Sequence, residues 1–307
     1  MNTHPTIACI GECMIELSSI DLDQGRARVG FAGDTFNTAI YLARLRPGVS
    51  YVSNLGHDGF SGQMLRVMAD EGIDAGLVGL HASRLPGLYS IEVDATGERS
   101  FRYWRDSSAA RTLFQGVGAT FDDLARFDTI YLSGITLAIL PADIRAALTA
   151  RLADLRATGH RIVFDSNYRP RLWPDADTAR AAFAAIWAAT TLALPSLDDE
   201  SALHPGTTPG AVLDRLSALG VTEIALKNGA AGPLIRADGH DIQVSLPRAP
   251  RVVDTTGAGD SFNAGYLAAR LDRAAPGDAA AAGHRLAMTV IAHPGAVIPR
   301  AAMPAQD

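Results

Sequence analysis

Lysine is nearly missing from this chain of 307 residues, in which Lys227 is the only one. Arginine and alanine are abundant, so a coding bias toward these two residues explains the shortage. Against that background, a retained lysine indicates a site where a planar guanidinium does not replace a compact ammonium. A lysine left on the surface by chance explains the observation equally well on this ground alone.

Cysteine and long apolar runs are also scarce. The spacing of Cys9 and Cys13 fits neither a zinc knuckle nor a thioredoxin motif, and two buried thiols near a first strand are the simpler interpretation. No apolar stretch is long and charge-free enough to span a bilayer. Residues 1–6 lack the charged and then apolar pattern of a signal peptide. We therefore expect a soluble, cytoplasmic protein with no membrane partner.

Charge of either sign is moderate. The formal net charge is −6 at pH 7, which argues against a nucleic-acid partner, because such proteins normally carry a basic face. A small anionic ligand is compatible with this balance, since a local group of arginines is enough to hold one. Apolar residues make up 48% of the chain, so it can bury a large core.

Apolar runs and helical patterns alternate along most of the chain, which predicts a doubly wound, mostly parallel α/β sheet with helices on both faces. The expected strands are Thr6–Gly11, Ser50–Ser53, Thr129–Ser133, Arg161–Asp165, Leu192–Leu194 and Thr222–Leu226. The expected helices are Phe36–Leu45, Phe60–Glu71, Ala142–Ala157, Ala211–Leu219, Asp260–Leu271 and Asp278–Ala292. No linker divides the chain, so residues 1–307 are expected to form a single domain.

One segment interrupts the alternation. Leu88–Val93 and Ser100–Trp104 are strand-like and flank a turn at 94–98, which predicts a β-hairpin. We assume that Tyr89 lies opposite Tyr103. One face then carries Tyr89, Ile91, Phe101, Tyr103 and Arg105. Such a face suits a lid over a polar ligand, and an ordinary hairpin packed on the core, with Arg105 reaching water, is the alternative.

The most informative motif spans residues 252–262, where an apolar pair leads into Asp-Thr-Thr-Gly-Ala-Gly-Asp and then into a helix. Glycine lets the backbone turn sharply and approach a ligand closely. The free amides of Gly257, Ala258 and Gly259 would point out of the helix start, where the helix dipole favours an anion. No Lys-Ser or Lys-Thr follows the glycines, so this is not a Walker P-loop.

Asp260 stands where those amides converge. A carboxylate there can accept a proton from a hydroxyl while the amides hold a phosphoryl group, and phosphoryl transfer requires little more from a protein. An aspartate that only caps the helix is the alternative for an isolated Gly-Ala-Gly-Asp. The length of the motif favours the catalytic interpretation.

Over Asp254–Asp260 the motif resembles the C-terminal signature of the ribokinase-like (PfkB) carbohydrate kinases. The strings Ala-Gly-Asp-Thr-Phe-Asn-Thr-Ala at 32–39 and Leu-Gly-His-Asp-Gly-Phe-Ser-Gly at 55–62 resemble the N-terminal signature of the same family. The matches follow the family order across almost the whole chain. The resemblance implies the ribokinase-like fold with a small β-sheet lid, here about residues 12–31 and 86–106. It also implies Asp260 as catalytic base, ATP and Mg²⁺, and a monovalent cation.

Two strings depart from the family pattern. Ala32 replaces a glycine whose backbone lies close to the sugar in the family. The alanine side chain leaves slightly less room between the backbone and the sugar. Pro195–Glu200 occupies the place of the family's Asn-x-x-Glu motif, which positions magnesium through water. Ser196 replaces the asparagine there, and Asp199 or Glu200 would supply the carboxylate. Helix capping with acidic residues in the first turn is the alternative for this string.

Within the family, the chain most resembles the members that act on 2-keto-3-deoxygluconate, through the strings 11–17, 85–89, 96–99, 103–105, 165–170 and 195–200. A buried substrate carboxylate needs a cation and hydrogen-bond donors, and arginine can supply two donors at once. The resemblance implies that the following residues contact the substrate: Gly33, Asp34, Thr35, Phe36, Asn37, Tyr89, Tyr103, Trp104, Arg105, Arg169 and Asp260. A surface arginine in a turn before Pro170 is the alternative for Arg169.

The resemblance also implies a nucleotide site. Its residues are Asn167, Tyr168, Arg169, Lys227, Asn228, Gly229, Ala230, Ala231, Gly232, Gly257, Ala258, Gly259, Asp260 and His284. Asn228-Gly229 is a strong turn signal as well, and a turn can line a pocket, so both interpretations can hold. For His284, on the last expected helix, a structural role is the alternative.

The reaction implied by the resemblance is transfer of the γ-phosphoryl group of ATP to O6 of 2-keto-3-deoxy-D-gluconate, which gives 2-keto-3-deoxy-6-phosphogluconate. A kinase of the same family that acts on fructose, ribose or a related sugar acid is the alternative. Because lids in this family often pair between subunits, we expect a homo-oligomer joined through the lid.

Overall fold

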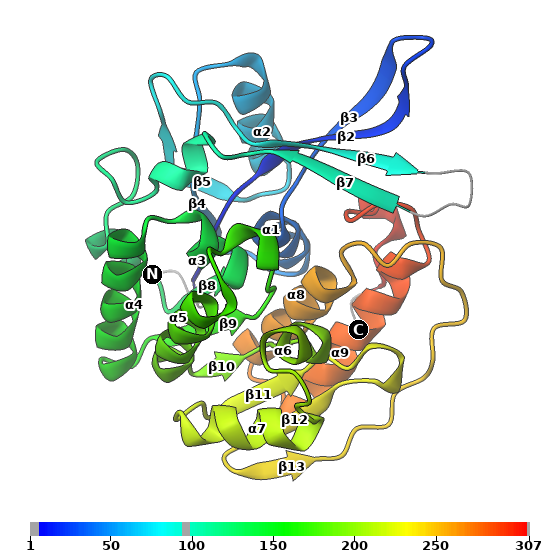
Figure 1. Cartoon of the computed structure of the whole chain (residues 1–307). Coiled ribbons are helices and arrows are strands. Elements are labelled where there is room, and N and C mark those ends of the chain that lie inside the picture. Colours follow the sequence, from blue (N-terminus) through cyan, green and yellow to red (C-terminus); the bar gives the residue numbers. More distant parts are fainter. Residues whose placement is uncertain (1–5, 94–98, 306–307) are drawn as a thin grey trace.

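The computed structural model describes residues 6–93 and 99–305, which form a nine-stranded sheet flanked by helices and a separate four-stranded sheet (Figure 1). The strands of the large sheet lie in the order β13-β12-β11-β10-β9-β8-β1-β4-β5. All pairings from β11 to β5 are parallel, and β12 and β13 extend one edge in the antiparallel direction. The doubly wound, mostly parallel fold predicted from the sequence is confirmed.

The strands of the large sheet are short. They are β1 (Ile7–Ile10), β4 (Val49–Leu55), β5 (Asp74–Leu80), β8 (Thr129–Ser133), β9 (Arg161–Asp165), β10 (Leu192–Ala193), β11 (Glu223–Leu226), β12 (Leu234–Ala237) and β13 (His240–Ile242). Burial on both faces explains why the central ones read as continuous apolar runs rather than as alternating patterns. The expected bounds of β8 and β9 agree with the structure to the residue.

Helices cover both faces of this sheet. One face carries α1 (Asp34–Leu45), α2 (Gly59–Asp70), α8 (Ala258–Leu271) and α9 (Pro276–Ile291). The other carries α3 (Gly134–Ile139), α4 (Ala142–Ala157), α5 (Ala176–Ala189), α6 (Leu197–Leu203) and α7 (Pro209–Ala218). Alternate residues of β1 enter the two apolar cores, Ile7 and Cys9 on the first face and Ala8 and Ile10 on the second.

The small sheet has the strand order β3-β2-β6-β7, with β2 (Met14–Asp21), β3 (Arg26–Ala32), β6 (Leu88–Val93) and β7 (Arg99–Trp104). It projects beyond the helical layers at the top of the view (Figure 1). Tyr89 pairs with Tyr103, which confirms the assumed register of the hairpin. The turn expected at 94–98 lies outside the described residues.

The chain reverses its direction of winding at β1, which has β4 on one side and β8 on the other. In open α/β sheets, ligands bind at the carboxyl ends of the strands where the order reverses. Here β1 also leads through residues 11–13 into β2, and β3 leads directly into α1. The small sheet is therefore rooted at the edge where a ligand is expected.

Two smaller features concern the cysteines and the helices. Cys9 and Cys13 are free and buried, and burial raises the pKa of the Cys13 thiol. No helix in the described part of the chain has the length and apolar character needed to cross a membrane.

Candidate active site

Asp260 lies in the first turn of α8, against the first turn of α1. The side-chain amide of Asn37 donates a hydrogen bond to its carboxylate (Nδ2 to Oδ2, 2.8 Å), and the Thr38 hydroxyl donates to its carbonyl (3.2 Å). Removal from water, and then the negative charge of Asp34, raise the pKa of Asp260 to about 8. A carboxylate with this pKa is suited to accept a proton near neutral pH.

The backbone before Asp260 forms the start of a long helix. Gly257 has a left-handed conformation (φ +75°), and a Cβ atom added to it would lie 2.6 Å from the Ala296 carbonyl oxygen. Only glycine satisfies both conditions. The Ala258 amide donates to the Thr255 carbonyl (3.2 Å) and closes a turn. Within the described residues, the amides of Gly257 and Gly259 have no acceptor, as is usual for a helix start that can hold an anion.

A buried polar network lies beneath this helix start. The Lys227 ammonium donates to Asp165 (Nζ to Oδ1, 2.9 Å) and to Asn263 (Nζ to Oδ1, 3.0 Å). Asn263 in turn donates to the other oxygen of Asp165 (2.8 Å) and to the Tyr131 hydroxyl (3.1 Å). Burial raises the pKa of Asp165 despite the nearby ammonium. Sequence reasoning assigned no role to Asp165 or Asn263, although Asn263 stands one helical turn after Asp260.

The turn between β3 and α1 brings the first signature motif to the same place. A Cβ atom on Gly33 would lie 2.0 Å from the Glu12 carbonyl oxygen, so this close approach requires glycine. The Asp34 carboxylate accepts a hydrogen bond from Asn167 (2.8 Å), which follows β9. The side chains of Thr35 and Phe36 are fully buried and contact Tyr51 in the core. Only their backbone remains to face a ligand at this site.

Three of the five residues that were expected on one face of the lid do lie on a common face. The rings of Tyr89 and Tyr103 lie 5.7 Å apart, and the Arg105 guanidinium lies over the Tyr103 ring at 5.9 Å. The Tyr89 hydroxyl donates to Glu16. Trp104 is different: alternation along β7 turns it to the opposite face from Tyr103, and it is 61% exposed. The expected contact between Trp104 and the substrate therefore has no support from this arrangement.

Arg105 is buried and forms an ion pair with Glu12, a partner that sequence reasoning missed. Glu12 stands where the chain leaves β1 for the small sheet, and Arg105 stands where it returns from β7. Arg105 therefore does not extend to water, as the alternative interpretation required. Its Nε has no partner among the described residues, so one donor of the guanidinium is left for another acceptor.

The acidic residues at the start of α6 have two different roles. Asp199 accepts hydrogen bonds from the Ser166 hydroxyl (2.8 Å) and from Arg169 (3.3 Å), and it lies at the same edge as Asp165. Glu200 is fully buried on the other side and is paired with Arg215. Glu200 is thus not available to a metal ion. Ser196 caps α6 by accepting from the Asp199 amide (3.2 Å), which confirms the capping interpretation for this position.

The remaining residues expected at the nucleotide lie further along the same edge. Residues 227–233 connect β11 to the antiparallel β12, with a short 3₁₀ turn at Gly229–Ala231, so the turn interpretation is confirmed. Tyr168 is buried among the aromatic side chains near α5, with its ring 5.9 Å from Phe183. His284 on α9 contacts the Pro247 carbonyl (Nε2 to O, 2.6 Å), so it anchors the loop before the motif at 252–262.

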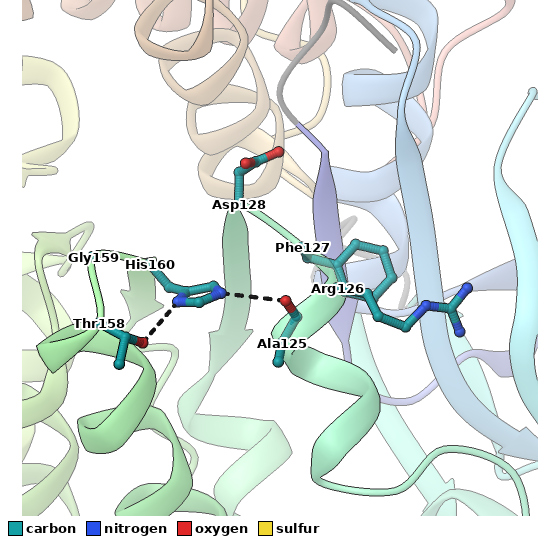
Figure 2. A pocket seen from close by; sticks show the side chains of 7 residues that line it. All are labelled: Ala125, Arg126, Phe127, Asp128, Thr158, Gly159 and His160. Carbon is teal, nitrogen blue, oxygen red and sulfur yellow. Dashed lines mark hydrogen bonds between the residues drawn. The ribbon is translucent and has the colours of Figure 1, made fainter. Parts of the chain in front are cut away.

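A pocket of about 270 Å³ lies on the opposite edge of the sheet, at the amino ends of β8 and β9. Figure 2 shows its lining residues: Ala125, Arg126, Phe127, Asp128, Thr158, Gly159 and His160. The His160 ring contacts the Ala125 carbonyl (3.3 Å) and the Thr158 hydroxyl (3.2 Å), while Arg126 and Asp128 point away from it (Figure 2). Asp128 accepts hydrogen bonds from Thr6 and Arg126 forms an ion pair with Asp123, so both charged side chains have partners outside the pocket, which is separate from the site around Asp260.

Comparison with known proteins agrees with this geometry. The sequence profile described as pfkB family carbohydrate kinase matches residues 4–302. The chain is 46% identical over 313 residues to 2-dehydro-3-deoxygluconokinase of Dickeya dadantii, covering 99% of this chain and 100% of the relative. It is also 46% identical over 309 residues to the protein of the same name in Escherichia coli, covering 97% and 99%.

The fold comparison covers the same length. The crystal structure of a PfkB protein from Polaromonas sp. JS666 superimposes with a TM-score of 0.83 at 27% identity, covering 97% of this chain and 98% of that one. The similarities to these two relatives and to this structure run almost from end to end of both chains. They therefore concern the large sheet, the small sheet and the site between them together.

Proposed function

Because the chain belongs to the pfkB family of carbohydrate kinases, we propose that it transfers the γ-phosphoryl group of ATP to O6 of 2-keto-3-deoxy-D-gluconate. The substrate is also called 2-dehydro-3-deoxygluconate, and the relatives in Dickeya dadantii and Escherichia coli are named for the same compound. The product is 2-keto-3-deoxy-6-phosphogluconate. The observation that carries the proposal is the position of Asp260, at a helix start with free amides and in contact with Asn37.

The chemistry follows from those groups. Asp260 takes the proton from the O6 hydroxyl as this oxygen forms a bond to the γ-phosphorus. The bond between the γ-phosphorus and the bridging oxygen breaks, and ADP leaves with that oxygen. The amides of Gly257 and Gly259 stabilise negative charge on the transferring group, which is the main contribution that a protein makes to this reaction. The small sheet, as a lid, excludes water and so limits hydrolysis of ATP.

The substrate carboxylate requires a cation. Arg105 retains an unpaired Nε, and Arg169 is half-exposed at the carboxyl end of β9 with one contact to Asp199. These two arginines are the proposed carboxylate ligands, supported by Tyr89, Tyr103 and the backbone of residues 33–37. A kinase with the same base but no such cations would favour neutral sugars, so the arginines carry the choice of a sugar acid over fructose or ribose.

A magnesium ion at this site would have few ligands from the protein. Among the described residues no group of three or more His, Cys, Asp or Glu side chains could hold a metal ion. Mg²⁺ commonly binds nucleotide phosphates, water and one or two carboxylates, and Asp199 is the carboxylate of the acidic string in α6 that lies at this edge. Such an ion neutralises charge on the phosphates when bound. Asp199 would hold it indirectly, and a monovalent cation also belongs to this proposal.

The nucleotide is proposed to lie along the carboxyl edge, from the amides of 257–260 past Asn167 and residues 227–232 toward the loop held by His284. A single domain with its lid, working in the cytoplasm where ATP is abundant, completes the proposal. We further propose that two chains pair through their small sheets. Light scattering of the purified protein tests this pairing, since a mass near that of one chain contradicts it.

A substrate panel tests the function. ADP release is measured with 2-keto-3-deoxygluconate, its galactonate epimer, gluconate, fructose and ribose, and the product is examined by ³¹P–¹H NMR to locate the phosphate. We expect 2-keto-3-deoxygluconate to give the highest kcat/KM, with the phosphate on O6. A higher kcat/KM for fructose or ribose would establish the alternative substrate and leave the kinase assignment intact.

A further inference from the structure

The only lysine of the chain lies within the active site. Lys227 follows β11, and its Nζ lies between Asp165 at the end of β9 (2.9 Å) and Asn263 on α8 (3.0 Å). Its side chain is 14% exposed, and that of Asp165 is 4% exposed. A buried ammonium is costly unless it is paired in this way. The pairing thus ties together three elements that meet at one edge of the sheet.

This ammonium lies directly under the helix start that carries the base. A Cβ atom added to Gly259 would be 3.8 Å from Nζ, which places the ammonium near the first turn of α8, and its hydrogen bond to Asn263 holds the next turn of the same helix. Asn263 also contacts the Tyr131 hydroxyl (3.1 Å), and Tyr131 contacts the Thr38 hydroxyl (3.2 Å). Thr38 then donates to the Asp260 carbonyl (3.2 Å). Lys227 is therefore linked to Asp260 by a chain of hydrogen bonds through Asn263, Tyr131 and Thr38.

We propose that Lys227 is a positioning residue for phosphoryl transfer: held by Asp165 and Asn263, its ammonium fixes the first turn of α8 and keeps a positive charge beside Asp260. The inference rests on the proposed function in so far as Asp260 is the base. It assigns to Lys227 an action on the base through α8, rather than a direct contact with the nucleotide.

The charges around Asp260 support this role. Removal from water, and then Asp34 from α1 and Asp165 from β9, raise its pKa, while the Asn37 hydrogen bond and the Lys227 charge lower it. Without the ammonium, two aspartates would oppose ionisation of the base with only a neutral amide to favour it. Lys227 therefore holds Asp260 closer to the anionic form that accepts a proton.

The geometry also explains why arginine does not stand here in a chain that otherwise uses arginine. An ammonium offers three donors around one small atom, and two of them reach acceptors at 2.9 and 3.0 Å. A guanidinium is longer and planar, with its donors spread over a fork. It would displace Asn263 or the first turn of α8. This supports the interpretation of the single lysine as a retained site.

The first experiment compares pH profiles of kcat/KM for K227M, D165N and the K227M/D165N double variant. In K227M the acidic limb is expected to move to higher pH, because a cation that lowers the pKa of the base is lost. In D165N it is expected to move down, because an anion is lost. The double variant should return toward the wild-type limb. Unchanged limbs, or shifts of both single variants in the same direction, would overturn the proposal.

Lys227→Arg separates position from charge. It keeps the charge, so its acidic limb should stay within a few tenths of a unit of wild type, while kcat falls at least about tenfold because the turn of α8 is displaced. A K227R protein with wild-type kcat would show that an ammonium is not required and would overturn the positional part of the proposal.

A second measurement needs neither substrate nor activity. Because the chain has one lysine, growth on [¹³Cε]lysine gives a protein with a single lysine ¹³C NMR signal. We expect this signal to show a step when Asp260 titrates, with a midpoint near pH 8, and to lose that step in D260N. A signal that is indifferent to D260N would contradict the coupling between Lys227 and the base.

These outcomes separate the two proposals. If the sugar panel reveals no activity on 2-keto-3-deoxygluconate but the lysine signal responds to Asp260, the substrate assignment fails and the role of Lys227 stands. If the panel succeeds and the lysine signal does not respond, only the role of Lys227 fails.

Discussion

The side-chain amide of Asn37 donates a hydrogen bond of 2.8 Å to the carboxylate of Asp260, although the two residues are 223 positions apart in the chain. The contact joins the first turns of α1 and α8, and so joins the two signature motifs. Thr38 adds a second bond between the same turns, to the Asp260 carbonyl (3.2 Å). The sugar side and the phosphate side of the site are thus held together before any ligand binds.

Asp260→Asn should abolish turnover without abolishing binding. Asparagine keeps the shape and can still accept the Asn37 hydrogen bond, but it cannot take the proton from O6. We expect kcat to fall roughly 10²- to 10⁴-fold, the usual contribution of a general base. Calorimetric titration should show that ATP and the sugar acid bind with nearly unchanged affinity. Turnover within a few-fold of wild type would remove Asp260 from its role.

The activity of the free enzyme should depend on pH through Asp260. Its pKa is raised to about 8, and the base must be ionised to accept a proton. We therefore expect kcat/KM to rise about tenfold per pH unit below pH 8 and to level off above it. Asp34→Asn removes an anion that raises the pKa of Asp260, so its profile should level off at lower pH. A profile that is flat from pH 6 to 9 would contradict the assignment.

The same raised pKa predicts that Asp260→Asn stabilises the fold. The pKa is about 8 in the folded protein against an ordinary value of 3.8, so the folded state binds the proton more tightly than the unfolded state. The carboxyl group then costs the folded protein stability as pH rises from about 4 to 8. We expect the Tm of the variant to exceed that of wild type by an amount that grows over this range. Equal Tm values at pH 8 would argue against the raised pKa.

The sequence alone predicts the main frame of the fold because buried parallel strands and long helices leave clear apolar patterns. The strands at 129–133 and 161–165 and the helix at 142–157 agree with the structure to the residue. The strand β10 was expected at 192–194, whereas the edge strands β12 and β13 are too short to leave such a signal. The alternation in β6 and β7 predicted the shared face of Tyr89 and Tyr103, and it should have separated Trp104 from them.

The site was less predictable because partnerships across the fold leave no local signal. Lys227 was noticed for its rarity, but nothing near it in sequence indicated Asp165 or Asn263, which are 62 and 36 positions away. Arg105 was expected on the lid, whereas Glu12, its buried partner, is 93 positions away. Asp199 and Glu200 are neighbours in sequence, and only the helical turn of α6 sends one to the site and the other into the core.

Replacing Arg105 should impair the substrate acid more than neutral sugars. We expect Arg105→Ala to raise KM for 2-keto-3-deoxygluconate at least about tenfold over its effect on fructose, since one charge-assisted contact is lost. The ratio of the two KM effects cancels any loss of folded protein. Equal effects on both sugars would leave Arg169 as the carboxylate ligand and Arg105 as a structural residue.

The effects of replacing Glu12 and Arg105 on the free energy of unfolding should be coupled. Both side chains are at least 95% buried, so removing either charge leaves the other unpaired, at a cost of about 3–5 kcal/mol. The double variant E12Q/R105M removes both charges and should be less destabilised than either single variant. Denaturant unfolding of the four proteins measures this coupling. Additive losses would show that the two side chains do not depend on each other in the fold.

Gly257 and Gly259 provide a matched test of the helix start. Alanine at 257 must adopt φ +75°, which costs about 1–2 kcal/mol, and its Cβ would meet the Ala296 carbonyl oxygen at 2.6 Å. Alanine at 259 meets only the Lys227 side chain, with Nζ and Cδ at ordinary distances of 3.8 and 4.0 Å. We therefore expect Gly257→Ala to lower Tm by several degrees and to raise KM for ATP, because the turned amides no longer point at the phosphates. Gly259→Ala should keep a Tm close to wild type. If the two variants unfold together and bind ATP equally well, the left-handed turn at Gly257 does not shape the phosphate site, and the anion must be held elsewhere along the carboxyl edge.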